Sequence, residues 1–271
     1  IMWIQSLKLN KFRNYLSQNI EFNENINIFL GDNAQGKTNL LESIYYLANA
    51  KSFKSFRDKD LIMFYEKEMS LDGIIRKNEA FKNVKIKVNE NNKEIFVNDI
   101  KYNKNKDLKS LFKLVLFTPE DLTIIKDGPN FRRKLIDDII ISVNFSYKAL
   151  KKDFDKILSQ RNKLLKNQRS KYFKTELMAF DQQIIRLNYK IYRYREKYIS
   201  LINTYANKNH LNLTENKENL SIIYRPDIVA KDIEEYREKF SKNLSDDLKY
   251  FRTTSGSQRD EIDIFINGKD T

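Results

Sequence analysis

The beginning of the chain alternates apolar and polar side chains, which is the period of a β-strand with one buried face. The apolar members of this alternation are Ile4, Leu7, Leu9, Phe12, Ile20, Phe22, Ile26 and Ile28. Two or three short strands are therefore predicted before Gly31. A second strand-like region runs from Met69 to Val115, and its Asn91-Asn92 pair predicts a turn between two strands.

Helical spacing follows the glycine loop and then dominates the middle of the chain. The first helix is predicted from the apolar positions Leu40, Leu41, Ile44, Tyr45, Leu47 and Ala48. Between Pro129 and Pro226 there is neither glycine nor proline, and apolar side chains recur at alternating spacings of three and four. This seam consists of Leu177, Phe180, Ile184, Leu187, Ile191, Tyr194, Tyr198, Leu201 and Tyr205, and a shorter one of Tyr147, Leu150, Phe154, Ile157 and Leu164.

Two such helices, joined by the polar stretch 166–171, would form an antiparallel hairpin. The alternative is that the seam packs on the rest of the protein, and the pattern favours neither. Strand-like sequence returns at 220–224, a helical segment follows at 227–250, and Ile262, Ile264 and Ile266 precede Asn267-Gly268, a hairpin signal. Because the sequence stops at Thr271, we expect the partner strand to be missing and the chain to be truncated.

The fold class expected is α/β, with a mixed β-sheet and flanking helices interrupted by a hairpin-like α-helical domain. Residues 1–120 would form the first lobe and residues 121–209 the helical domain. Residues 210–271 would return to the lobe.

Composition narrows the functional classes. The chain has 271 residues, no cysteine and one histidine, so disulfides, thiolate metal sites and zinc chemistry are excluded or disfavoured. No apolar run approaches the ~20 residues of a membrane-spanning helix, and the start of the chain lacks the layout of a signal peptide. The expected location is the cytoplasm, without a membrane partner.

A formal charge of +13 favours polyanionic partners such as nucleic acid. Between residues 130 and 175 there are 13 Lys and Arg against 4 Asp and Glu, so this stretch carries much of the excess. The alternative is a solvated helical surface with no such partner. Candidate contacts to DNA phosphates are Lys51, Lys54, Arg57, Lys148, Lys151 and Lys152.

The most specific motif is a phosphate-binding loop. It reads Gly31-Asp32-Asn33-Ala34-Gln35-Gly36-Lys37-Thr38, which fits G-x-x-x-x-G-K-[ST] at every fixed position. The glycines let the backbone curl around phosphates, Lys37 is predicted to reach the β- and γ-phosphates, and the Thr38 hydroxyl to ligate Mg²⁺. No Asn-Lys-x-Asp sequence that would read guanine is present, so ATP is favoured over GTP.

Several blocks around this loop carry a resemblance to a known family. They are Leu9-Asn10-Lys11-Phe12-Arg13-Asn14-Tyr15, the loop itself with Asn39-Leu40-Leu41-Glu42, Phe117-Thr118-Pro119-Glu120-Asp121-Leu122, Ile125-Lys126, Pro129 with Arg132-Arg133, Arg259-Asp260-Glu261, and Phe265-Ile266-Asn267-Gly268-Lys269. In this order they resemble the N-terminal part of the RecF family, in the SMC-like branch of the ABC-type ATPases. One departure is Gly256-Ser257-Gln258, where the family usually has Gly-Pro-His.

The resemblance implies roles that spacing alone does not give. Arg13 and Asn14 would approach the nucleotide beside Lys37 and Thr38, although a surface salt bridge is the alternative for Arg13. Glu120 and Asp121 would lie in a loop that senses γ-phosphate and Mg²⁺, or would simply cap a helix.

The family hydrolyses ATP in a dimer that needs a signature helix and an acidic strand. Residues 254–258 imitate the signature, but strand-like sequence follows them. Residues 135–138 imitate the acidic strand, but their surroundings are helical. Both true elements are expected beyond Thr271, so no catalytic set is complete, and this chain should bind ATP better than it hydrolyses it.

The function implied is that of an ATP-dependent DNA-binding protein of replication and recombinational repair. Such a protein binds duplex and junction DNA when ATP drives homodimerisation, has weak DNA-dependent ATPase activity, and assists recombinase loading with RecO and RecR. One alternative is the nucleotide-binding subunit of another SMC-like nuclease or defence complex. Another is a phosphotransferase or GTPase with no nucleic-acid role.

Overall fold

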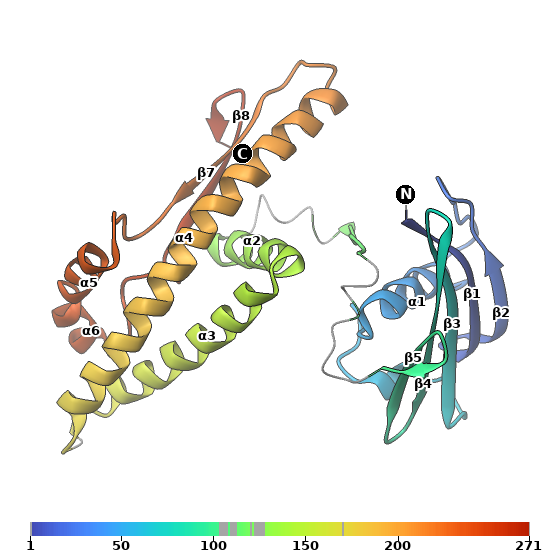
Figure 1. The fold of residues 1–271 in the computed structure, drawn as a ribbon, viewed down its shortest axis with the longest axis horizontal. Helices are drawn as coiled ribbons and strands as arrows, with labels where there is room; N and C mark the ends of the chain where they lie inside the picture. The colour runs from blue at the N-terminus through green and yellow to red at the C-terminus, as the bar shows by residue number, and fades with distance from the viewer. Residues whose placement is uncertain are drawn as a thin grey trace. The chain divides into compact units, whose positions relative to one another are not determined.

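The structure, a computed structural model, describes residues 2–102, 108, 113–119, 121, 128–169 and 171–270. The chain divides into two compact units, Ile1–Phe117 and Thr118–Thr271. In Figure 1 the first unit combines a sheet with one main helix, and the second combines long helices with a small sheet. No helix among the described residues is both long and apolar enough to cross a lipid bilayer.

The first unit is built on a six-stranded antiparallel sheet in the order β2-β1-β3-β4-β5-β6. Its elements are β1 (Met2–Phe12), β2 (Tyr15–Glu21), α1 (Lys37–Asn49), the 3₁₀ helix η1 (Asp58–Leu61), β3 (Glu68–Lys77), β4 (Ala80–Asn89), β5 (Lys93–Val97) and β6 (Ile100–Lys101). Helix α1 packs so closely on β3 that a Cβ atom at Gly73 would lie 2.3 Å from Cδ2 of Leu47. This packing fixes the helix that follows the phosphate-binding loop.

The segment before the glycine loop differs from the prediction. Residues 22–30 are assigned to no strand, and Ile26, Ile28 and Leu30 are 79%, 76% and 88% exposed. Every strand pair in the described part of the chain is antiparallel. Apolar alternation predicts a face that could be buried, but strand formation also needs a neighbouring strand.

The second unit contains the predicted helical hairpin. Its elements are α2 (Pro129–Val143), α3 (Phe145–Lys166), α4 (Phe173–Leu213), β7 (Leu220–Arg225), α5 (Ile233–Ser241), α6 (Leu244–Tyr250), β8 (Glu261–Ile266) and β9 (Lys269–Asp270). Arg161 on α3 bonds Asp181 on α4, and Asn144 before α3 bonds Tyr198, so the two helices run antiparallel. The hairpin prediction is therefore confirmed, and the assignment of residues 121–209 and 210–271 to separate domains stays a prediction.

The buried face of α4 serves both packing alternatives, because it contacts α3 and the strand β7. This face differs from the predicted seam: Leu201 and Tyr205 are 46% and 67% exposed, whereas Asn188 and Arg195 are buried. The seam prediction was wrong at its C-terminal end. The predicted buried face of α4 was chosen from apolar residues alone, and the true face includes buried polar residues.

The C-terminal hairpin forms, in contrast to the prediction. Strand β8 pairs antiparallel with β7 and with the short β9, through the register Ile266–Lys269. Asn267 and Gly268 have φ angles of 51° and 74°, the left-handed values that a tight hairpin turn requires. Two residues after the turn are enough for pairing, so the partner strand is present.

A buried arginine network holds the second unit together. Arg195, 2% exposed, bonds both carboxylate oxygens of Asp137 at 3.0 and 2.9 Å and one oxygen of Asp260 at 2.7 Å. Burial disfavours the charged guanidinium, but the carboxylate of Asp137 outweighs that effect and raises the pKa of Arg195 well above its usual range. Asp137 belongs to α2, so the acidic pair at 137–138 is helical, as the sequence indicated.

Candidate nucleotide-binding site

The glycine loop turns sharply into the N-terminus of α1. Gly31, Ala34 and Gly36 have φ angles of 150°, 66° and 103°. Gly36 is the N-cap of α1, and a Cβ atom there would lie 2.7 Å from Nδ2 of Asn14, so only glycine fits. Helix α1 has no side-chain cap and no acidic residue in its first turn. Its N-terminal N–H groups and positive dipole end are therefore available to an anion.

Lys37 and Thr38 stand at the start of α1, as the motif predicts. The ammonium of Lys37 donates to the carbonyl oxygens of Gly31 and Asp32 at 2.5 and 2.6 Å. These contacts fold the side chain back across the loop, where phosphate oxygens would compete for the same charge. Thr38 is exposed.

The turn between β1 and β2 supports the loop from the side. Tyr15 donates from its hydroxyl to the carbonyl of Gly36 at 3.2 Å, and Asn14 contacts the carbonyl of Gln35 at 3.4 Å. Asn39, on the first turn of α1, donates to Oδ1 of Asn14 at 2.9 Å. Asn14 therefore lies beside the loop, where the resemblance places it.

Arg13 points elsewhere in this turn. Its Nε and Nη2 atoms donate to the two carboxylate oxygens of Glu42 at 2.9 and 2.8 Å, and Nη1 donates to the carbonyl of Asp60 at 2.8 Å. Glu42 is fully buried. Hydrogen bonds from Ser55 and Arg57 in turn lower the pKa of the Asp60 carboxyl below its usual value. Arg13 thus makes a salt bridge, as in the alternative considered, but with a buried carboxylate, and its own side chain is partly exposed. Its approach to the nucleotide stays a prediction.

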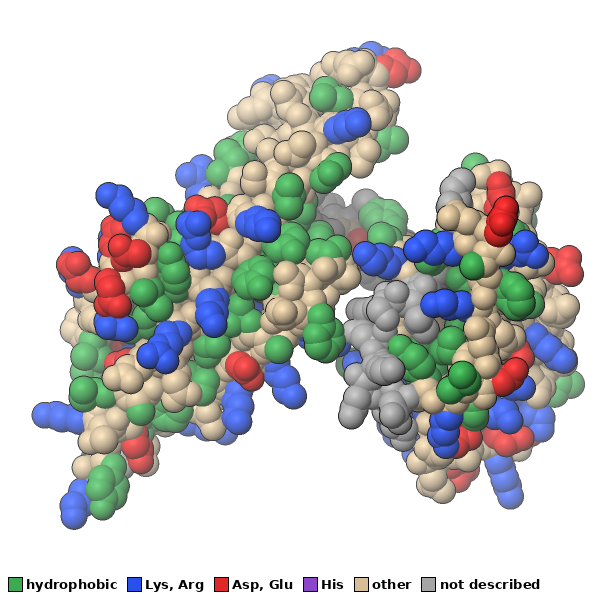
Figure 2. Space-filling view, in the orientation of Figure 1, with side chains coloured by type: hydrophobic (Ala, Val, Ile, Leu, Met, Phe, Trp, Pro, Cys, Tyr) green, Lys and Arg blue, Asp and Glu red, His purple; other side chains and the backbone are tan. Residues whose placement is uncertain are grey.

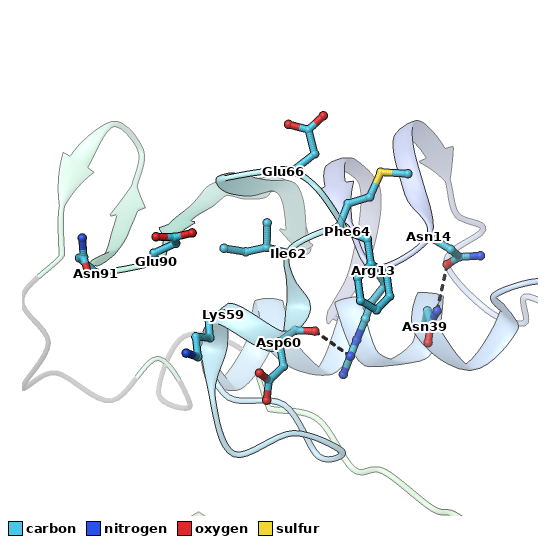
Figure 3. Close-up of a pocket in the computed structure, with 11 residues that line it drawn as sticks. Arg13, Asn14, Asn39, Lys59, Asp60, Ile62, Phe64, Glu66, Glu90 and Asn91 are labelled. Atoms are coloured by element: carbon cyan, nitrogen blue, oxygen red, sulfur yellow. Dashed lines mark hydrogen bonds between the residues drawn. The ribbon is translucent and has the colours of Figure 1, made fainter.

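A pocket of about 1060 Å³ opens next to this turn. Arg13, Asn14 and Asn39 line one side of it, and Ile62, Met63 and Phe64 contribute apolar surface. Figure 3 shows the charged side chains of Lys59, Asp60, Glu66 and Glu90 around the same space. Because Asn14 also contacts the loop, the pocket and the loop are neighbours.

Comparison with known proteins agrees with this geometry. The family model of the AAA ATPase domain matches residues 2–270. The DNA replication and repair protein RecF of Streptococcus gordonii is 37% identical over 273 residues, which cover 99% of this chain and 75% of that protein. RecF of Clostridium tetani is 36% identical over 277 residues, covering 100% and 75%. The chain belongs to the RecF family.

Solved RecF structures match over nearly the whole chain. The recombination mediator protein RecF-ATP of the RecFOR pathway has a TM-score of 0.82 at 32% identity, covering 99% of this chain and 74% of that one. Its RecF-ATPrS counterpart gives 0.83 at the same identity. The predicted α/β ATPase fold and the resemblance to RecF are confirmed. Two of the blocks that carried the resemblance also contact each other, because Nη1 of Arg133 donates to the carbonyl of Asp260 at 2.6 Å.

The basic residues predicted to contact DNA differ in their ion pairs. Lys51, Lys54, Lys148 and Lys152 are exposed. Arg57 is paired with Asp60 at 2.9 Å, and Lys151 with Asp155 at 2.5 Å. Figure 2 shows Lys and Arg side chains scattered among acidic and apolar ones on the visible faces of both units. Their contact with DNA stays a prediction.

Of the two acidic residues predicted to sense γ-phosphate, the structure describes Asp121. Glu120 lies outside the described residues. The Asp121 carboxylate accepts from the amide and hydroxyl of Thr118 at 2.7 and 3.0 Å, so it stabilises a local turn. Among the described residues no group of three or more His, Cys, Asp or Glu side chains could hold a metal ion.

Sequence reasoning missed the roles of three residues of this site: Tyr15, Asn39 and Glu42. Tyr15 and Asn39 belong to blocks that carried the resemblance, but no motif assigns them a role. A signal existed for Glu42, because it lies on α1 among apolar positions, and a carboxylate there needs a buried partner.

Proposed function

We propose that this chain binds ATP with Mg²⁺ at residues 31–38 and is an ATP-dependent DNA-binding protein of replication and recombinational repair. The observation that carries the proposal is the phosphate-binding loop, which places the Lys37 ammonium and the N-terminus of α1 side by side. Backbone N–H groups and one lysine are the recurring means of holding β- and γ-phosphates. ATP-bound relatives support the choice of nucleotide.

The neighbouring pocket would take the nucleoside. Its apolar side chains Ile62, Met63 and Phe64 suit a flat base, and Asn14 and Asn39 offer polar groups. Both asparagines also contact each other. The base would therefore lie beside the β1–β2 turn.

Magnesium would depend on the Thr38 hydroxyl. Mg²⁺ in such sites keeps several waters and uses substrate phosphates with one or two protein ligands. Thr38 lies at the first turn of α1, where its hydroxyl would supply one such protein ligand. Bound Mg²⁺ would neutralise charge on the phosphates.

DNA would be held mainly through its phosphates, in duplexes and junctions and without regard to sequence. By family, the partners include a second copy of the chain in the presence of ATP, as well as RecO and RecR, and the compartment is the cytoplasm. The exposed side chains of Lys51, Lys54, Arg57, Lys148 and Lys152 are candidates for these contacts, together with the partly buried Lys151.

Lys54→Gln should weaken DNA binding uniformly across sequences. One lost phosphate contact lowers the slope of log affinity against log salt by about 0.9. Titrations of fluorescent duplexes at several salt concentrations measure this slope. Lys82→Gln, which removes an exposed lysine on β4, is the control and should leave the slope unchanged. An equal slope for Lys54→Gln and wild type would remove Lys54 from the DNA contacts.

The proposal as a whole is tested by measuring ATP binding, and then duplex affinity with and without ATP. We expect ATP to bind and to strengthen DNA binding. DNA affinity that ignores both ATP and salt would contradict the proposed function.

A further inference from the structure

A closed ring of hydrogen bonds joins Arg13 to the basic loop, residues 51–57, which contains Lys51, Lys54 and Arg57. On one side Arg13 bonds Glu42, and the same Glu42 Oε1 accepts from the Ser52 hydroxyl at 2.5 Å. On the other side Arg13 bonds the Asp60 carbonyl, and the Asp60 carboxylate accepts from Ser55 at 2.7 Å. Both ends of the basic loop are therefore tied to one guanidinium.

Ser52 transmits this tie to the loop backbone. Its Oγ donates to Glu42 and also accepts the amide N–H groups of Lys54 and Ser55, each at 2.8 Å. The Ser52 hydroxyl thus holds the backbone at Lys54, whose side chain is exposed. Loss of the Glu42 contact would free the hydroxyl and loosen this turn.

Glu42 cannot change one partner without affecting the other. It is fully buried, and Arg13 and Ser52 satisfy its carboxylate. A buried carboxylate whose cationic partner moves away is strongly destabilised unless another donor compensates. A displacement of the Arg13 guanidinium would therefore change the hydrogen bond between Glu42 and Ser52.

The phosphate-binding loop is in contact with the segments that carry Arg13 and Glu42. Arg13 precedes Asn14 and Tyr15, which contact the carbonyls of Gln35 and Gly36. Glu42 itself lies on α1, the helix that begins at Lys37. The loop and the ring are thus joined through the β1–β2 turn and through α1.

We propose that Glu42 is a positioning residue that couples occupancy of the phosphate-binding loop to the position of the basic loop 51–57. The inference rests on the proposed function, since the ligands at the two ends are a nucleotide and DNA phosphates. Nucleotide binding at the loop shifts the β1–β2 turn and the start of α1, the Arg13–Glu42 pair moves with them, and Glu42 re-forms its bond with Ser52. Lys54 is then presented differently to DNA.

Two serine variants separate this coupling from simple stabilisation. Ser52→Ala removes the hydroxyl that links Glu42 to the basic loop but leaves the Arg13–Glu42 pair. Ser43→Ala is the matched control, because it deletes a buried hydroxyl next to Glu42 that bonds only the Leu40 carbonyl among the contacts described. Glu42→Gln, which keeps the size of the side chain but weakens both contacts, is the second test variant.

The first measurement is duplex affinity with and without ATP, alongside ATP affinity and thermal stability. We expect ATP to strengthen DNA binding roughly 5-fold or more in wild type and Ser43→Ala, and less than about 2-fold in Ser52→Ala and Glu42→Gln. ATP affinity should stay near the wild-type value in Ser52→Ala. Full ATP stimulation in a folded Ser52→Ala protein would overturn the inference.

Hydrogen exchange of the Lys54 and Ser55 amides gives a readout that does not need DNA. In wild type, ATP should change the exchange rates of these two amides, and in Ser52→Ala it should not. ATP binding with no change at either amide would overturn the coupling and leave the nucleotide site intact. Failure of ATP to bind at all would overturn the proposed function, and the coupling with it.

Discussion

Lys37→Ala should lower the affinity of this chain for ATP by roughly 10- to 100-fold, since a hydrogen bond to a charged group contributes about 1.5–3 kcal/mol. The Lys37 ammonium already lies across the loop, with carbonyl partners at 2.5 and 2.6 Å. Alanine leaves the loop backbone and the helix N-terminus to hold the phosphates without a mobile positive charge. Equilibrium titration with a fluorescent ATP analogue measures the change.

Two controls separate loss of the site from loss of the fold. Lys82→Ala removes an exposed lysine of the same unit and should bind ATP like wild type. Thermal melting of Lys37→Ala should stay close to wild type, because the Lys37 ammonium bonds carbonyl groups of the loop itself and, among the described residues, no other element. Unchanged ATP affinity in a folded Lys37→Ala protein would contradict the assignment of residues 31–38 as the phosphate site.

The phosphate loop could be predicted from sequence because its chemistry lies in consecutive residues. Gly36 has a left-handed φ, and the side chain of Asn14 lies where a Cβ atom would be. Both features favour glycine at this position of the motif. The pair Arg13–Glu42 joins residues 29 positions apart, so no local spacing predicts it. The resemblance predicted that Arg13 lies near the site, but its partner Glu42 is identified only in the folded chain.

The fold shows the same division. Helix α4 was predicted from period, yet its buried face includes Asn188 and Arg195, which a search for apolar positions rejects. Asn188 accepts the Ser257 amide at 2.9 Å, and Arg195 donates to the Ser257 carbonyl at 2.6 Å. These polar side chains are buried because the loop before β8 brings its backbone to them. A seam built only from apolar residues therefore drifts off the true face toward Leu201 and Tyr205.

Arg195→Met should destabilise the second unit by about 3–5 kcal/mol, the cost of removing one partner from a buried ion pair. Methionine fills part of the volume but leaves the carboxylates of Asp137 and Asp260 without their guanidinium. Asp137 is 5% exposed and Asp260 is 2% exposed, so water reaches neither well. Urea denaturation followed by circular dichroism measures the loss in free energy of unfolding.

Arg193→Met provides the control on the same helix. Its guanidinium pairs with Glu196 at 2.9 Å, but both side chains are about half exposed, and such surface pairs contribute only about 0–1 kcal/mol. The two variants thus differ in burial rather than in the residue lost. A similar small change for both would mean that other donors compensate Asp137 and Asp260 for the lost guanidinium. Restoration of stability by Asp137→Asn in the Arg195→Met background would instead identify the unpaired carboxylate as the cause, because an amide carries no charge to bury.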